Sequence, residues 1–261
     1  RQKWEAIMER KLIGHADAII AVSEQKTAYL KTLIPGNNQR WCTITNGYDP
    51  ESFEDLLSQA RRQDEFIDFV YTGRLFKNRQ GYSLAHALGQ IKQENPDLIK
   101  NIRIHFYGGV SPEIQAEYDR LICRYGLDSC FVFHGDVDFE TSKRVQVEAD
   151  YLLLIVDTGK TADGVIPGKL FEYVASKRPI FALCDSAATK EIITKADIGT
   201  VVPVEDVARC KAALLNLLNQ EPSVKIFEAN QQYLQQFDRK YLTQRLAQLF
   251  NEVVESTSVN N

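Results

Sequence analysis

The chain has 261 residues, of which 44% are hydrophobic and 25% charged, and its formal net charge is −4. This composition is typical of a soluble globular protein with one large or two small domains, and no run approaches the roughly 20 apolar residues that cross a bilayer. The negative balance excludes a protein whose main ligand is nucleic acid. The five cysteines are odd in number and lack a Cys-x-x-Cys pair, so we expect reduced thiols and a cytoplasmic protein.

The first 50 residues are predicted to alternate helix and strand twice. The expected elements are a helix over 4–13, a strand over 18–22, a helix over 26–33 with Ser23 as its N-cap, and a strand over 41–45. Two strands are too few for a closed parallel sheet, so we expect that part of this domain lies upstream of the chain. Residues 1–50 are therefore interpreted as a domain remnant and the polar stretch 51–65 as a linker.

From residue 66 to 224 strands and helices alternate with short connections. The predicted strands cover 66–71, 102–107, 131–133, 151–156, 179–183 and 200–202, and the predicted helices cover 82–93, 112–125, 139–148, 187–194 and 207–218, with another helix beginning at Pro167. This alternation indicates an α/β domain with a doubly wound parallel sheet. Residues 225–261 are expected to form one long amphipathic helix, centred on 226–254, that folds back toward the first domain.

Glycines follow the predicted strands at the edge where ligands bind such sheets. Gly73 follows the first strand of the series, Gly108 and Gly109 the second, and Gly135 the third. Together with the glycines of the loop over 157–168, they predict a crevice that a ligand approaches closely.

The loop and helix start over 163–173 is the strongest single signal for a ligand. Pro167 suits a first helical turn, and a helix start with Gly164 and Gly168 nearby is suited to an anion. Lys169 adds a positive charge, and the Glu172 carboxylate can accept hydrogen bonds from a diol. A phosphate beside a diol indicates a nucleotide, whereas the alternative is a helix that only packs on the sheet.

Several short motifs together resemble the retaining family 4 glycosyltransferases, which are built from two Rossmann domains in the GT-B fold. They are ADAIIAVS at 16–23, NGYD at 46–49, YTGRL at 71–75, YG at 107–108, FHG at 133–135, PGKLFEY at 167–173 and KRPI at 177–180. The resemblance covers most of the chain and assigns 66–224 to the nucleotide-sugar donor domain and 1–50 to the end of the acceptor domain.

The resemblance implies that Arg74 clamps the donor diphosphate, since a guanidinium fork matches phosphate oxygens. Members of the family usually have a lysine where this chain has Gln80, so the second cation is open between Lys77, Arg79 and Lys169.

The resemblance also implies that Glu172 holds the ribose hydroxyls, while Gly164 stands where the family has another glutamate. Catalysis is assigned to Arg74, Lys169 and Glu172, by positioning and cationic stabilisation of the leaving nucleoside diphosphate. The expected donor-binding residues are Gly73, Arg74, Gln80, Gly108, Gly109, Val137, Asp163, Gly164, Val165, Ile166, Pro167, Gly168, Lys169 and Glu172.

The four histidines, His15, His86, His105 and His134, are scattered and lack partners at metal or triad spacing, so all four are interpreted as structural. We expect neither a metal nor another cofactor.

The leading hypothesis is a glycosyltransferase that moves a sugar from a nucleoside-diphosphate donor to an acceptor that the sequence does not identify, with retention. A sugar-nucleotide 2-epimerase of the same architecture and a non-catalytic nucleotide-sugar-binding module are the alternatives. We expect this chain alone to be inactive, no nucleic-acid partner, and room for peripheral membrane association through the absent part of the first domain.

Overall fold

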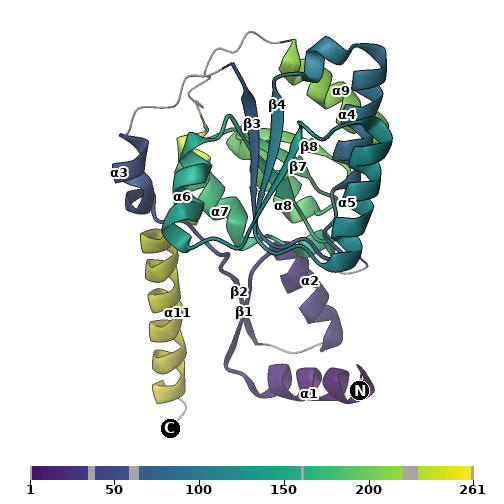
Figure 1. Ribbon diagram of the computed structural model, residues 1–261. Coiled ribbons are helices and arrows are strands. Elements are labelled where there is room, and N and C mark those ends of the chain that lie inside the picture. The colour runs from purple at the N-terminus through teal and green to yellow at the C-terminus, as the bar shows by residue number, and fades with distance from the viewer. Residues whose placement is uncertain (1, 35–38, 59–64, 160–161, 220–228, 260–261) are drawn as a thin grey trace.

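The computed structural model describes residues 2–34, 39–58, 65–159, 162–219 and 229–259. A six-stranded parallel sheet lies between two layers of helices, and a smaller two-stranded unit and the last helix extend from one end of it (Figure 1). Within these ranges no helix is both long enough and apolar enough to cross a membrane.

The large sheet has the order β5-β4-β3-β6-β7-β8. Its strands are β3 (Ile67–Thr72), β4 (Ile102–Tyr107), β5 (Phe131–Gly135), β6 (Tyr151–Ile155), β7 (Ile180–Leu183) and β8 (Gly199–Val202). The chain moves outward from β3 in one direction and then crosses over to β6 on the other side. The strand order therefore reverses between β3 and β6, and a ligand crevice is expected outside the carboxyl ends of the strands at that point.

Apolar side chains on alternate positions explain why both faces of the sheet are covered. One core contains Phe69, Ile104 and Phe106, and it packs against helices α4 (Tyr82–Glu94), α5 (Pro112–Tyr125) and α9 (Val207–Leu218). The opposite core is formed largely by β6, β7, α7 (Gly168–Ser176) and α8 (Ala187–Ala196), and α6 (Phe139–Glu148) lies beside α7 (Figure 1). The short 3-10 turns η2 (Pro96–Ile99) and η3 (Ala162–Gly164) lie in the connections.

The N-terminal segment forms its own small α/β unit. Its elements are α1 (Gln2–His15), β1 (Ala18–Ala21), α2 (Glu24–Leu33) and β2 (Arg40–Thr43), followed by η1 (Pro50–Phe53) and α3 (Glu54–Leu57). Strands β1 and β2 are parallel, and among the described residues Ile19, Ala21 and Leu30 form a small buried cluster around them. Such a small core leaves apolar side chains of α1 outside, with Trp4 72% exposed.

The C-terminal segment does not form the single long helix expected over 226–254. Residues 220–228 lie outside the described ranges, and the remainder divides into α10 (Gln231–Leu234), η4 (Gln235–Phe237) and α11 (Arg239–Val259). The break falls at Asp238, whose extended backbone forms a bridge with Tyr48. Phe237 accepts a hydrogen bond from the Tyr48 N–H at 3.0 Å, and Tyr48 accepts one from the Arg239 N–H at 3.0 Å. Pairing with a distant segment thus interrupts the helix.

Helix α11 lies beside the N-terminal unit. The Arg40 guanidinium donates a hydrogen bond to Ser256 Oγ at 2.7 Å and forms an ion pair with Glu252 at 3.5 Å. The last helix therefore contacts residues more than 200 positions earlier in the chain.

Asp68 is the most strongly perturbed carboxyl group on the sheet. The Arg103 guanidinium donates to both of its oxygens, at 2.6 and 2.7 Å, and His105 Nε2 lies 3.3 Å from Oδ1. Burial by itself would raise the pKa of Asp68, but the hydrogen bonds from His105 and Arg103 outweigh burial and lower this pKa to about 2.

We predict that Asp68→Asn removes a pH-dependent contribution to stability. Because the folded pKa of Asp68 lies below its ordinary value of 3.8, the charged carboxylate stabilises the fold above about pH 4, and this contribution is lost as pH falls toward 2. The free energies of unfolding of the two proteins should differ by about 2 kcal/mol at pH 7 and by about half of that at pH 3. Urea titrations at both pH values measure the difference, and a constant difference would contradict the prediction.

Candidate functional site

The loops at the carboxyl ends of β3, β4 and β5 are tied together through their backbones. The Gly73 N–H donates to Tyr107 O at 2.8 Å, and the Gly108 N–H donates to Gly135 O at 2.6 Å. At Gly108 the φ angle is +137°, and a Cβ atom there would lie 2.1 Å from the carbonyl oxygen of Gly73. Gly108 therefore permits a backbone contact that other residues would prevent, which holds the predicted crevice in shape.

Arg74 follows β3 in its loop and is an exposed cation at this edge. Its side chain is 75% exposed, and its guanidinium lies 3.7 Å from the Asp136 carboxylate. Asp136 is anchored in turn, because its Oδ1 accepts a hydrogen bond from the Gly109 N–H at 2.9 Å. The prediction that Arg74 meets phosphate is compatible with this geometry, and the sequence analysis did not identify Asp136 as its partner.

The structure narrows the choice of a second cation for the donor diphosphate among Lys77, Arg79 and Lys169. Arg79 forms an ion pair with Asp157 at 2.6 Å and is committed to that carboxylate. The side-chain amide of Gln80 donates to the backbone carbonyl of Lys77. The backbone carbonyl of Gln80 accepts a hydrogen bond from Tyr118 OH at 2.7 Å. Lys77 itself is exposed. Gln80 therefore presents no charge at the position where the family that this chain resembles has a lysine.

Lys169, in the first turn of α7, pairs with Glu172, which lies three residues further along the helix. Lys169 Nζ lies 2.8 Å from Glu172 Oε2, and both side chains are about one third exposed. Pro167 is the N-cap of this helix and Gly168 its first residue, so the expectation that Pro167 lies within the first turn is corrected by one position. Nothing lies within 4 Å of a Cβ built on Gly168, which leaves the helix start open.

The side of Glu172 that faces the protein is held by a residue that the sequence analysis missed. Gln146 of α6 is fully buried, and its Nε2 lies 3.2 Å from Glu172 Oε2. The sequence contained no signal for this contact, because Gln146 is one polar residue within a helix that has several.

In the loop between β6 and α7, several groups that were predicted to bind the donor make contacts within the protein. Gly164 O accepts from Ser23 Oγ at 2.8 Å, and Asp163 Oδ1 accepts from the Ala187 N–H at 3.1 Å. Val165 O accepts from the hydroxyl groups of Ser186, the N-cap of α8, and Thr189 within it, and Ile166 is buried in the core. A Cβ at Gly164 would lie 3.0 Å from Ser23 Oγ, so the close neighbour of this glycine is the start of α2. The donor contacts of these four residues stay a prediction.

The remaining predicted residue, Val137, lies in the loop after β5. It is 37% exposed, and Gly135 before it has a φ angle of +73°. The contact of Val137 with a base also stays a prediction.

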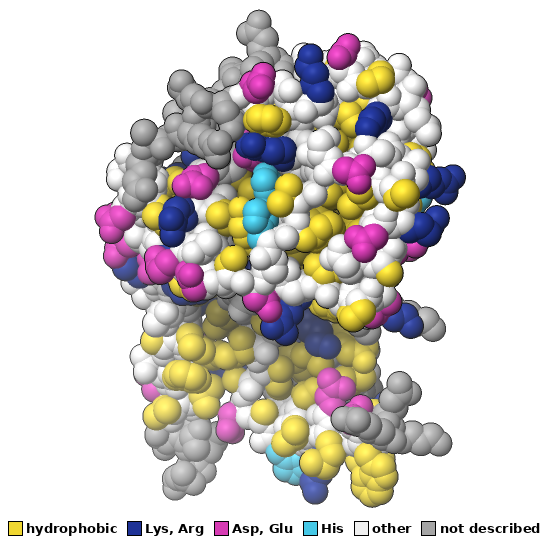
Figure 2. Space-filling view, viewed as in Figure 1, with side chains coloured by type: hydrophobic (Ala, Val, Ile, Leu, Met, Phe, Trp, Pro, Cys, Tyr) yellow, Lys and Arg dark blue, Asp and Glu magenta, His cyan; other side chains and the backbone are white. Residues whose placement is uncertain are grey.

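The sequence suggested that the four histidines are scattered, but the structure brings two of them together. His105 Nδ1 lies 3.0 Å from His134 Nε2, and the ring of Tyr107 stacks on His134 with the centroids 4.0 Å apart. Adjacent strands β4 and β5 bring these rings together, and Figure 2 shows histidine side chains gathered on this face of the molecule. Among the described residues no group of three or more His, Cys, Asp or Glu side chains could hold a metal ion.

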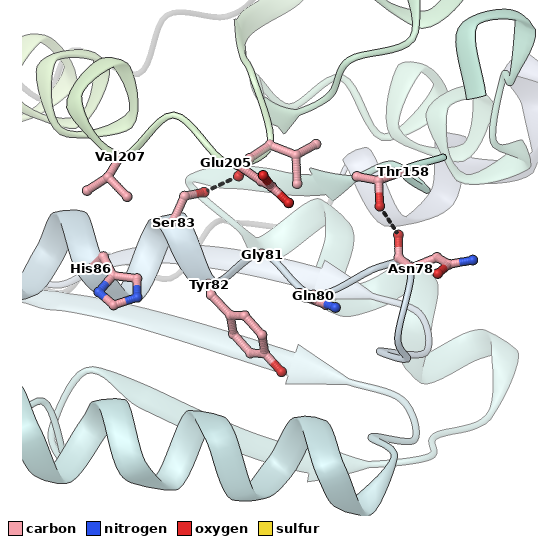
Figure 3. Close-up of a pocket in the computed structure, with 10 residues that line it drawn as sticks. Asn78, Gln80, Gly81, Tyr82, Ser83, His86, Thr158, Glu205 and Val207 are labelled. Carbon is pink, nitrogen blue, oxygen red and sulfur yellow. Dashed lines mark hydrogen bonds between the residues drawn. The ribbon is translucent and has the colours of Figure 1, made fainter. Parts of the chain in front are cut away.

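A pocket of about 330 Å³ lies at the same edge of the sheet, between the N-terminal ends of α4 and α9 (Figure 3). It is lined by Asn78, Gln80, Gly81, Tyr82, Ser83, His86, Thr158, Val204, Glu205 and Val207. Ser83 Oγ donates to Val204 O at 2.6 Å, which joins the two helix starts. Of the predicted site residues the pocket includes Gln80, while Arg74, Lys169 and Glu172 lie outside it. The pocket therefore overlaps the predicted donor-binding residues at Gln80 and does not include the three residues assigned to catalysis.

The strand order and the glycine-lined carboxyl edge define the class of Rossmann-like nucleotide-binding domains. Residues 67–220 match the family model described as glycosyl transferases group 1, so the chain belongs to this family. A comparison with curated proteins finds no match.

Solved structures of similar fold agree with this assignment. Sucrose-phosphate synthase from Thermosynechococcus elongatus is 18% identical with a TM-score of 0.75, over 98% of this chain and 63% of that one. HepE of Anabaena in complex with UDP-glucose is 16% identical with a TM-score of 0.75, over 97% of this chain and 68% of that one. Pneumococcal O-GlcNAc transferase GtfA in complex with UDP and GlcNAc is 15% identical with a TM-score of 0.66, over 95% of this chain and 47% of that one. The chain spans less than two thirds of the first of these proteins and about half of the third. These similarities confirm the predicted fold class, a Rossmann-like half of the GT-B type.

We predict that Gly108→Ala destabilises the fold, because the new methyl group meets the Gly73 carbonyl and the φ angle is unfavourable for alanine. The expected loss is about 3 to 5 kcal/mol. Gly168→Ala is the control: its surroundings are open, and alanine at a helix start should change stability by less than about 1 kcal/mol. Urea denaturation followed by circular dichroism compares the two variants, and similar effects in both would contradict the close approach at Gly108.

Proposed function

We propose that this chain is the donor-binding part of a glycosyltransferase that transfers a sugar from a nucleoside-diphosphate donor to an acceptor still to be identified. The observation that carries the proposal is that Arg74, in the loop after β3, and the Lys169–Glu172 pair, near the start of α7, lie at the carboxyl edge of the sheet, on both sides of the point where the strand order reverses. Family membership supports the transferase chemistry.

The diphosphate and the ribose of a nucleoside diphosphate each have a chemically suitable partner at this edge. The exposed Arg74 guanidinium suits the diphosphate, because its fork of N–H donors matches phosphate oxygens. The Glu172 carboxylate suits the ribose diol, and the open start of α7 beside Gly168 adds the positive end of a helix dipole. Uracil is the first base to test, since HepE and GtfA are described in complexes with UDP-glucose or UDP.

The proposed chemistry relies on positioning and on charge. Arg74, Lys169 and the α7 dipole stabilise the leaving diphosphate, and no metal is assigned to the site. Retention at the anomeric carbon is part of the proposal and rests on the family resemblance. Binding of the acceptor is assigned to residues outside this chain, so the chain by itself is proposed to be inactive.

A nucleotide-sugar-binding module without turnover is the second candidate. It is favoured by one observation, the neutralisation of the cations around the crevice: Arg79 is paired with Asp157 and Lys169 with Glu172. Donor hydrolysis or transfer by a longer form of the protein would distinguish the two candidates.

We predict that a nucleoside diphosphate binds the chain and that Arg74→Ala weakens diphosphate binding by about 10- to 100-fold, while nucleoside binding is unchanged. The change removes a charged hydrogen-bond donor that only the phosphates engage. Calorimetry with UDP, GDP, ADP and the matching nucleosides measures both affinities. Arg120→Ala is the control, since it removes an exposed arginine from α5, away from this edge. No binding of any diphosphate at millimolar concentration, or equal losses for diphosphate and nucleoside, would contradict the assignment.

We predict further that Glu172→Gln weakens binding of the best diphosphate, with a small change in stability, because it removes the charge that receives the ribose hydroxyls. A 2′,3′-dideoxy form of that nucleotide should bind the unchanged protein more weakly, but should lose little further affinity in the variant. Glu191→Gln is the control, because Glu191 also pairs with a lysine on a helix surface. An equal dideoxy penalty in both proteins would show that Glu172 does not contact the ribose.

A further inference from the structure

Gln146 lies behind Glu172, at the centre of a buried polar cluster. Its Nε2 is 3.2 Å from each of three oxygens: Glu172 Oε2, Thr72 Oγ1 and Ser142 Oγ. Gln146 and Ser142 lie one turn apart on α6, and Thr72 is the last residue of β3. One amide group therefore links α6, β3 and α7.

The cluster occupies the place where β3 and β6 separate. These strands pair only at Phe69 with Tyr151 and at Val70 with Leu152. Beyond that point the Thr72 N–H donates to Tyr173 OH at 3.0 Å, and the same hydroxyl donates to Leu153 O at 3.3 Å. Tyr173 is buried beside Glu172 on α7, so the backbone of the split sheet and the candidate ribose ligand are held by the same group of residues.

Packing alone does not explain an amide at this position. Gln146 is fully buried, and its Oε1 has no hydrogen-bond partner within the described part of the chain. A buried carbonyl without a partner destabilises a fold, whereas an apolar side chain of the same length would fill the space without that penalty. The useful part of the side chain is thus its NH₂ group, which faces Glu172.

We propose that Gln146 is a positioning residue for donor binding. It acts through Glu172 and rests on the proposed function of that residue. Within the described residues the side-chain hydrogen bonds to the Glu172 carboxylate go to Oε2, from Lys169 Nζ and from Gln146 Nε2. These two donors fix the carboxylate, and Oε1 is presented to the ribose hydroxyl groups.

The first test is Gln146→Met, which keeps the side-chain length and removes both the NH₂ donor and the unpartnered carbonyl. The Kd of UDP, or of GDP or ADP if either binds more tightly, should rise about tenfold. The Kd of the 2′,3′-dideoxy form should stay within about twofold, and the unfolding midpoint should move by no more than about 3 °C. Ser142→Ala is the control, since Ser142 contacts Gln146 but not Glu172, and it should leave both Kd values unchanged.

The second test is Gln146→Glu, which remains informative even if the methionine variant folds poorly. The introduced carboxyl group lies beside Glu172, whose Oε2 also contacts Lys169. When protonated it still donates a hydrogen bond, and when ionised it repels Glu172. The affinity of this variant for the nucleotide, relative to the unchanged protein, should therefore fall as pH rises from 5.5 to 8.5.

The outcomes separate the two proposals. If the unchanged protein binds none of the three diphosphates, the proposed function fails and the role of Gln146 fails with it. If it binds one of them but Gln146→Met binds that nucleotide equally well, the positioning role is overturned and the donor site remains. The same conclusion follows if Gln146→Met loses as much affinity for the dideoxy form as for the nucleotide itself. A flat relative pH profile for Gln146→Glu also overturns the positioning role.

Discussion

The hydroxyl of Tyr173 bridges β3 and β6 where their own hydrogen bonding ends. It accepts from the Thr72 N–H and donates to Leu153 O, so it replaces the ladder contact that the diverging strands no longer make. Burial raises the pKa of Tyr173 well above its ordinary value, which keeps the hydroxyl neutral and able to donate. A doubly wound sheet binds ligands where neighbouring strands separate, and here one buried side chain bridges the two strands at that point. Because Tyr173 belongs to α7, it also determines where Lys169 and Glu172 lie.

Charge pairing is the second constraint on this edge of the sheet. Arg74, Arg79 and Lys169 each lie near a carboxylate, at 3.7, 2.6 and 2.8 Å respectively. Only the Arg74 pair is long and mostly exposed, and exposed pairs contribute little to stability. A phosphate can therefore compete for Arg74 at a small free-energy penalty, whereas Arg79 is held by a shorter and less exposed pair. The anionic ligand proposed for this chain thus has one readily available guanidinium.

The contact between Ser23 and Gly164 connects the N-terminal unit to the candidate site. The Ser23 hydroxyl caps α2 by accepting from the Lys26 N–H and also donates to Gly164 O, so one buried group serves a helix end and a loop between β6 and α7. A Cβ on residue 164 would meet this hydroxyl at 3.0 Å, and the resembling family has a glutamate at the same position. The departure from the family pattern therefore has a local physical reason, since this chain uses the position to seat α2 against the loop.

The sequence by itself determined the succession of strands and helices in the large sheet. The predicted bounds of α5, α6 and α9 agree with the structure, because apolar periodicity, proline and glycine signals are local. It also singled out Arg74, Lys169 and Glu172, whose types and motif spacing carry chemical meaning without coordinates. What it missed depends on contacts between distant segments. Pairing with Tyr48 broke the expected C-terminal helix at Asp238, adjacent strands brought His105 to His134, and the crossover through α6 placed Gln146 against Glu172. Local patterns determine elements, whereas hydrogen-bond partners far apart in the chain are decided only when the sheet is assembled.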